Sequence, residues 1–142
     1  MKQEATAEVI DWLVQQSLRG ADEGTLLQGV CDALVRHGMP LMRVMVGSGL
    51  LHPTIDSRVH LWRRGDRVSG EDFIRKTGDT EEWEKSPFRY LVESNASSMR
   101  RHLDGDYQDG EFELLDMLKA NGGTDYFAMV TRHADPAVSY RI

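Results

Sequence analysis

Residues 25–37, TLLQGVCDALVRH, carry the clearest periodic pattern in the chain. Six apolar side chains recur there at helical spacing and fall on one face: Leu26, Leu27, Val30, Cys31, Leu34 and Val35. Thr25 or Asp22 can cap the start of this helix, and Gly38 followed by Pro40 stops it. The stretch therefore predicts an amphipathic helix whose apolar face must be covered by other parts of the chain.

The neighbouring segments can supply that cover. Residues 5–19 carry a wide apolar stripe that predicts a preceding helix, closed by a glycine. Residues 41–46 and 58–63 alternate apolar and polar side chains, which predicts two strands. Between residues 70 and 80 the pattern supports at most a short strand around Phe73.

The second half of the chain predicts more strands than helices. Ser86 and Pro87 mark a helix start, because serine caps free amides and proline fits the first turn. The remaining elements are expected as a strand at 99–103, a helix at 111–120 and strands at 126–131 and 137–142, with a turn at 134–136. This order predicts an α+β fold, with helices packed on an antiparallel or mixed sheet.

Composition excludes several classes of protein. The 142 residues include 17 Lys plus Arg against 23 Asp plus Glu, a formal charge of −6. The length and the 40% hydrophobic content fit one globular domain over residues 1–142. No apolar run is long enough to cross a bilayer and no signal-peptide core is present, so we expect a cytoplasmic protein with no membrane partner. The acidic balance argues against nucleic acid as a partner.

The sequence contains no recognised catalytic motif and no metal-binding motif. A phosphate-binding glycine loop, HExxH and GxSxG are all missing. Residues 104–116 hold six acids and no Lys or Arg, but a calcium loop beginning at Asp104 fails in register. Its sixth position is Asp109 and its twelfth is Leu115, where glycine and glutamate are needed. We expect the dipole of the following helix to account for most of these acids.

Four side chains each allow a structural and a functional interpretation. Cys31, the single cysteine, lies in the apolar face of a predicted helix, which favours inert packing over a reactive thiol. Arg43 either pairs at the surface or joins other arginines in binding an anion. His52 is either a solvated loop residue or reaches a pocket. Trp62 is either core or a pocket wall, and core is favoured because large aromatics supply much of the burial in a small domain.

Short motifs follow one another along the chain: WLV at 12–14 with LRG at 18–20, GMPLMR at 38–43, LHP at 51–53, WRRG at 62–65, SPF at 86–88, MRRHL at 99–103 and GTDYFA at 123–128. In order and spacing they resemble the N-terminal sensory domain of bacterial class III adenylate cyclases, a GAF-like regulatory module. The resemblance covers residues 9–130, which is nearly the whole chain.

The resemblance implies a GAF-like fold with a central antiparallel sheet, and a small-molecule ligand between the sheet and its connecting helices. It implies a homodimer whose first two helices face the partner copy and couple to a cyclase-type output domain. The cyclase catalytic domain is not part of these residues, so we expect no enzymatic activity, and no cofactor is implied. The ligand-binding positions are inferred from placement and not from a family motif: Arg43, His52, Trp62, Arg101 and Tyr126.

Three functions remain open. The leading hypothesis is a non-catalytic sensory or regulatory module that dimerises and binds a small ligand. The second is a protein–protein interaction or dimerisation domain whose pocket is filled by side chains, with Val9 and Trp12 expected at the dimer interface. The third, ranked last, is a small enzyme whose scattered His, Asp and Arg residues converge in space.

Overall fold

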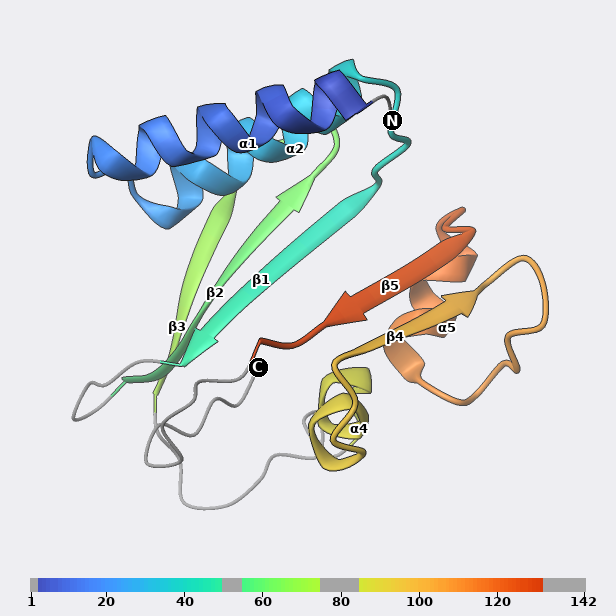
Figure 1. Cartoon of the computed structure of the whole chain (residues 1–142). Coiled ribbons are helices and arrows are strands. Elements are labelled where there is room, and N and C mark those ends of the chain that lie inside the picture. Colours follow the sequence, from blue (N-terminus) through green and yellow to red (C-terminus); the bar gives the residue numbers. More distant parts are fainter. Residues whose placement is uncertain (1–2, 50–54, 75–84, 132–142) are drawn as a thin grey trace. The chain divides into compact units, whose positions relative to one another are not determined.

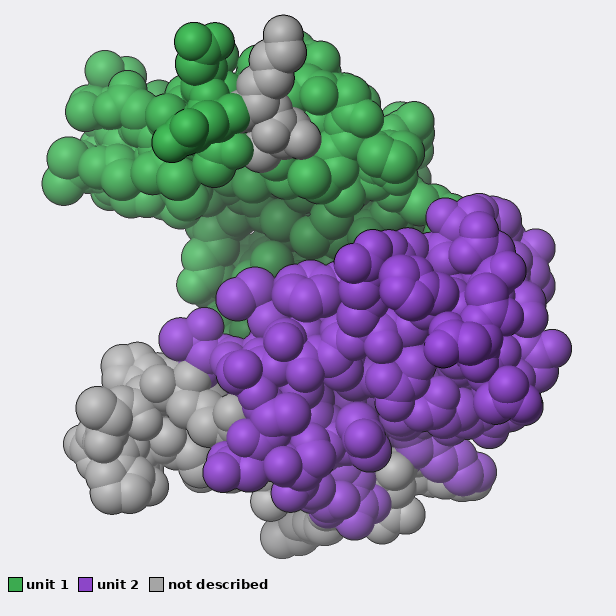
Figure 2. All heavy atoms as spheres, turned by 45° about the vertical axis from the view of Figure 1, so that its right-hand side comes forward, with its two compact units in different colours: residues 1–73 green, residues 74–142 purple. Residues whose placement is uncertain are grey.

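The structure, a computed structural model, describes residues 3–49, 55–74 and 85–131 (Figure 1). The chain divides into two compact units, residues 1–73 and residues 74–142 (Figure 2). The described elements are α1 (Gln3–Leu18), α2 (Glu23–Arg36), β1 (Arg43–Gly49), β2 (Ile55–Arg63), β3 (Ser69–Ile74), α4 (Pro87–Glu93), β4 (Ser98–His102), α5 (Glu113–Ala120) and β5 (Asp125–Met129). The predicted α+β class is thereby confirmed.

In the first unit, α2 packs its apolar face on a sheet of three strands in the order β1-β2-β3. β1 and β2 are antiparallel, with Val44 opposite Trp62. Leu27 and Cys31 of α2 form a buried cluster with Trp62, and Val44 packs against that cluster. The apolar face predicted from residues 25–37 is therefore the face that covers the sheet.

α1 packs on α2 through a contact that requires a glycine. A Cβ atom added at Gly29 of α2 would lie 2.0 Å from the ring of Trp12 in α1. Val9 is buried on α1 as well. Of the two predicted caps, Asp22 is the one that caps α2, because its Oδ1 accepts a hydrogen bond from the Thr25 N–H at 2.8 Å.

In the second unit, α4 and α5 accompany an antiparallel pair of strands, β4 and β5. Its innermost side chains are Leu91 of α4, Leu103 after β4 and Leu115 of α5. Ser86 caps α4, with its Oγ accepting from the Arg89 N–H at 3.1 Å, as the Ser-Pro pair predicts. Each element of this unit contributes at least one buried apolar side chain.

The element positions agree with the sequence pattern, apart from the boundaries. β3 is longer than the short strand expected around Phe73, and α5 begins two residues later than expected. The strand predicted at 137–142 and the turn at 134–136 lie outside the described residues. The described strands form two sheets, of three and two strands. The single central sheet of a GAF-like fold therefore stays a prediction.

Candidate functional site

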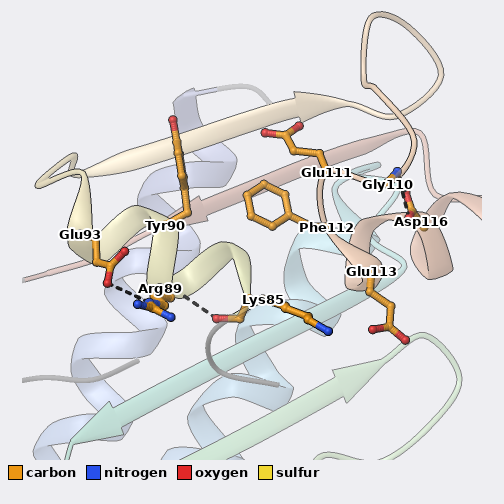
Figure 3. Close-up of a pocket in the computed structure, with 10 residues that line it drawn as sticks. Lys85, Arg89, Tyr90, Glu93, Gly110, Glu111, Phe112, Glu113 and Asp116 are labelled. Carbon is orange, nitrogen blue, oxygen red and sulfur yellow. Dashed lines mark hydrogen bonds and ion pairs between the residues drawn. The ribbon is translucent and has the colours of Figure 1, made fainter. Parts of the chain in front are cut away.

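A hollow in the second unit has a volume of about 570 Å³. One wall comes from α4 and the residues before it: Lys85, Ser86, Arg89, Tyr90 and Glu93. The other wall comes from the start of α5 and the residues before it: Gly110, Glu111, Phe112, Glu113 and Asp116. Figure 3 shows these side chains around the hollow. Its size is within the range of small-ligand sites.

Two aromatic rings from opposite walls meet in this hollow. Tyr90 and Phe112 pack edge to face, with ring centroids 5.8 Å apart and planes at 66°. Phe112 is buried, whereas Tyr90 is 48% exposed. The pair links α4 to α5 and leaves part of the Tyr90 ring accessible to a ligand.

Arg101 and Glu111 form a bidentate ion pair next to the Tyr90–Phe112 pair. The Arg101 Nη2 lies 2.7 Å from Glu111 Oε1, and Arg101 Nε lies 3.1 Å from each oxygen of the same carboxylate. The guanidinium carbon of Arg101 also lies 5.7 Å from the centroid of the Tyr90 ring. The hydrogen bonds to Glu111 raise the pKa of Arg101 above its ordinary value. Arg101 thus ties β4 to both walls of the hollow.

The wall before α5 is held in place by a buried tyrosine. The Tyr107 hydroxyl donates to Asp116 Oδ1 at 2.8 Å and accepts from the Phe112 N–H at 3.2 Å. Asp116 also accepts from the Gly110 N–H at 3.0 Å. Burial raises the pKa of Tyr107, while the Gly110 N–H and then the Tyr107 hydroxyl hold the pKa of Asp116 below its ordinary value. These bonds fix residues 110–116 before any ligand arrives.

Most of the charged groups around the hollow are already engaged. Arg89 Nε donates to Glu93 Oε1 at 2.8 Å, and Glu111 is held by Arg101. Glu113 is exposed and forms no ion pair or hydrogen bond within the described ranges. Four carboxylates and two cations line the hollow, so its walls carry a surplus of negative charge.

A second, smaller hollow of about 260 Å³ is lined by both members of the same ion pair. Glu111 lines both hollows, and Arg101 lines the smaller one. Arg100 also lines the smaller hollow, but its guanidinium is paired with Asp125. The cations of this second hollow are therefore already neutralised by neighbouring carboxylates.

Three of the six acids in residues 104–116 make specific side-chain contacts. Glu111 binds Arg101, Asp116 holds the loop, and Asp109 lies 2.7 Å from the Nζ of Lys119. No group of three or more potential metal ligands occurs among the described residues. Only Glu113 and Asp116 lie in the first turn of α5, so the helix dipole accounts for fewer of these acids than we expected.

The described members of the five predicted ligand-binding residues are divided between the two units. His52 lies outside the described residues. Arg101 and Tyr126 are direct partners across β4 and β5. Arg43 lies opposite Arg63, one position along from the Val44–Trp62 pair, so Arg43 and Trp62 point to opposite faces of their sheet.

Of its two interpretations, core or pocket wall, Trp62 is a core residue. It is 2% exposed and belongs to the core of the first unit, beside Cys31. Its indole N–H has no hydrogen-bond partner among the described residues. Cys31 is also buried as expected, and burial raises the pKa of its thiol to about 11. A thiol with that pKa stays protonated near neutral pH, which fits inert packing.

Tyr90, Glu111 and Phe112 are the residues of this site that the sequence reasoning did not select. Phe112 is predicted only as an apolar position of a helix, and Glu111 only as one of six acids. Of the three, only Tyr90 has a signal in the sequence: the Ser86 cap locates the start of α4 and so places Tyr90 on that helix. Nothing in the spacing of Glu111 and Arg101 predicts that they pair.

Comparison of the chain with family models, curated proteins and solved structures finds no significant match. No helix within the described ranges is long and apolar enough to cross a membrane.

Proposed function

We propose that the chain is a non-catalytic regulatory module that binds a small molecule and associates with a second copy of itself. The observation that carries this proposal is the hollow between α4 and residues 110–116, with its half-exposed Tyr90. The sequence resemblance to the GAF-like sensory domains of bacterial class III adenylate cyclases supports the same function. In that role the module controls a cyclase-type output domain and makes no cyclic AMP itself.

The walls of the hollow support ligand binding because they are fixed in advance. The Arg101–Glu111 pair and the Tyr107–Asp116 hydrogen bond hold the side that carries Phe112. A ligand entering such a site loses less free energy to ordering the protein than one that must close a mobile loop.

Self-association is supported by an apolar stripe on α1. Ile10, Val14 and Leu18 recur every four residues and are 55%, 48% and 79% exposed. An exposed apolar stripe on a helix is typical of an interface. Val9 and Trp12 were expected there, but Val9 is buried and Trp12 packs on α2. We therefore propose the opposite side of α1, with Ile10, Val14 and Leu18, as the interface.

Light scattering of the full chain tests the proposed interface. We expect a dimer that Val14→Glu converts to a monomer, because each copy would bury a charge in the contact. Gln15→Glu is the matched control, since Gln15 is exposed beside the stripe and the change adds the same charge. A monomeric wild type, or a Val14→Glu variant that remains a dimer, would contradict this interface.

A thermal-shift screen tests the ligand half of the proposal. A compound that binds only the folded chain raises the melting temperature with its concentration. The shift should disappear in Tyr90→Ala and persist in Phe127→Ala, since Phe127 is an exposed aromatic residue outside the hollow. Equal loss in both variants would place the ligand elsewhere.

The interaction-domain hypothesis is the second candidate because apolar side chains are also exposed on β5. Phe127 and Met129 are both more than half exposed, and they alternate along the strand on one face. This function requires no ligand in the hollow. It predicts an association that Phe127→Ala weakens and that no small molecule affects.

A further inference from the structure

We propose that the hollow between α4 and residues 110–116 binds a small organic cation, an ammonium or guanidinium group, beside the half-exposed Tyr90. This inference rests on the proposed ligand-binding function and names the chemical class of the ligand. It follows from three observations: how this unit holds its own cations, which charges in the hollow remain unpaired, and what part of Tyr90 stays open.

The second unit already holds two of its own cations between an aromatic ring and a carboxylate. The Arg101 guanidinium lies 5.7 Å from the centroid of Tyr90 and is bonded to Glu111. The Lys119 Nζ lies 5.9 Å from the centroid of Tyr107, and its carboxylate partner is Asp109. Aromatic rings attract cations through the negative potential of their faces, and a nearby carboxylate adds to that attraction.

The hollow also contains an aromatic ring and carboxylates, and one of these carboxylates has no partner among the described residues. Arg89 is bonded to Glu93, while Asp116 is satisfied by the loop. Glu113 has no partner among the residues that the structure describes. An entering cation would therefore gain an ion pair without breaking an existing one. An entering anion would face the surplus carboxylates of the walls.

The open part of the tyrosine ring gives such a cation a surface to lie on. Tyr90 is 48% exposed even though Arg101 and Phe112 both contact it. Figure 3 shows Tyr90 and Glu113 on opposite walls, with Phe112 between them. A flat guanidinium or a short alkylammonium is small enough for a hollow of about 570 Å³.

Amide chemical shifts of the full-length chain can test this class of ligand with two isosteric probes. Butylguanidinium carries the charge, and butylurea has nearly the same shape without it. We expect butylguanidinium to produce saturable shifts in residues 86–93 and 110–116, and butylurea to bind roughly tenfold more weakly. Raising the salt concentration should weaken the binding of butylguanidinium alone.

Glu113→Gln provides the decisive variant, because the residue is exposed and its loss should leave the fold intact. We expect it to weaken butylguanidinium binding roughly threefold. Glu4→Gln removes the same charge from α1 and should have no effect. Tyr90→Leu, which removes the ring, should weaken the binding further than Glu113→Gln does.

Several outcomes would overturn the inference. Equal affinity for butylurea and butylguanidinium, or unchanged binding in Glu113→Gln, would show that charge does not select the ligand. Butyrate producing the same shifts would assign the hollow to an anion and leave the proposed ligand-binding function intact. Absence of shifts from every probe would also refute the cation class. The broader proposal would then be judged by the thermal-shift screen and by the mass of the purified protein.

Discussion

The first unit is organised around apolar helix-to-sheet packing, whereas the second is organised around polar side chains that bridge its elements. In the first, Leu27, Cys31 and Trp62 bring α2 onto β2. In the second, apolar side chains are buried as well, but Arg101 and Tyr107 also hold the connection between β4 and α5 through polar contacts. The candidate site lies in the second unit, where the Arg101–Glu111 pair and the Tyr107–Asp116 hydrogen bond hold polar side chains in place.

The largest expected effect concerns the apolar core of the first unit. Trp62→Ala should lower the free energy of unfolding by about 3–5 kcal/mol, because the ring is buried and its removal leaves a cavity. Residue-resolved NMR during urea unfolding measures this effect in residues 3–49. The matched change in the second unit is Leu115→Ala, which should cost about 2–5 kcal/mol. A loss below about 1 kcal/mol for Trp62→Ala would contradict the central place of this ring in the core of the first unit.

The contact between α1 and α2 gives a prediction whose sign depends on the background. Gly29→Ala should destabilise the wild type by about 1–3 kcal/mol, because the new methyl group overlaps the Trp12 ring. In a Trp12→Ala background the same change should stabilise the helix by roughly 1 kcal/mol, since alanine favours helix more than glycine does. Urea unfolding of the four proteins measures the coupling. Equal effects of Gly29→Ala in both backgrounds would remove Trp12 from the contact.

The hydrogen bonds of the Tyr107 hydroxyl should contribute a comparable free energy to the stability of the second unit. Tyr107→Phe leaves the Phe112 N–H and Asp116 without their shared partner, which should cost about 1–3 kcal/mol. Hydrogen exchange should accelerate most in residues 107–116. A double-mutant cycle with Asp116→Asn isolates the Tyr107–Asp116 term. Additive effects of the two changes would show that this hydrogen bond does not hold the wall of the hollow.

Acidification should lower the free energy of unfolding of the two units by different amounts, and this difference should be smaller than the effects of the substitutions above. Gly110 lowers the pKa of Asp116 and Arg100 lowers the pKa of Asp125, while in the first unit Thr25 lowers the pKa of Asp22. A carboxylate with a lowered folded-state pKa contributes stability above its unfolded-state pKa, near 3.8, and loses it as the pH falls through the folded value. The second unit should therefore lose more stability than the first on acidification from about pH 5 to pH 3.

NMR-detected unfolding at both pH values measures this difference. Because all three carboxylates are close to solvent, the effect should be modest. Asp116→Asn combined with Asp125→Asn should flatten the pH dependence of the second unit, and Asp22→Asn should flatten that of the first. A first unit more sensitive to acid than the second would contradict this prediction.

The sequence predicts the first unit better because its organising signals are local. A helical period places Leu27 and Cys31 on one face, and Asp22 caps that helix three residues from its partner Thr25. Ser86 and Pro87 likewise locate α4. Each of these signals lies within a few neighbouring residues, which is the range over which periodicity and capping act.

The candidate site was missed because its decisive contacts join side chains that are separated along the chain. Arg101 and Glu111 are ten residues apart and belong to different elements, so no period relates them. The placement argument selected Arg101, which lines the smaller hollow, but it could not reveal that the Arg101 guanidinium is paired with Glu111. For Trp62, the large aromatic ring favours the core, and the structure agrees.

Native mass spectrometry of the protein as purified tests the central claim most directly, because it reports assembly and retained ligand together. Our account predicts a dimer, with added mass where a small molecule remains bound, and loss of that mass in Tyr90→Ala. A dimer without added mass that binds none of the screened compounds would favour the interaction-domain hypothesis. A monomer that neither retains nor binds a small molecule would contradict the account.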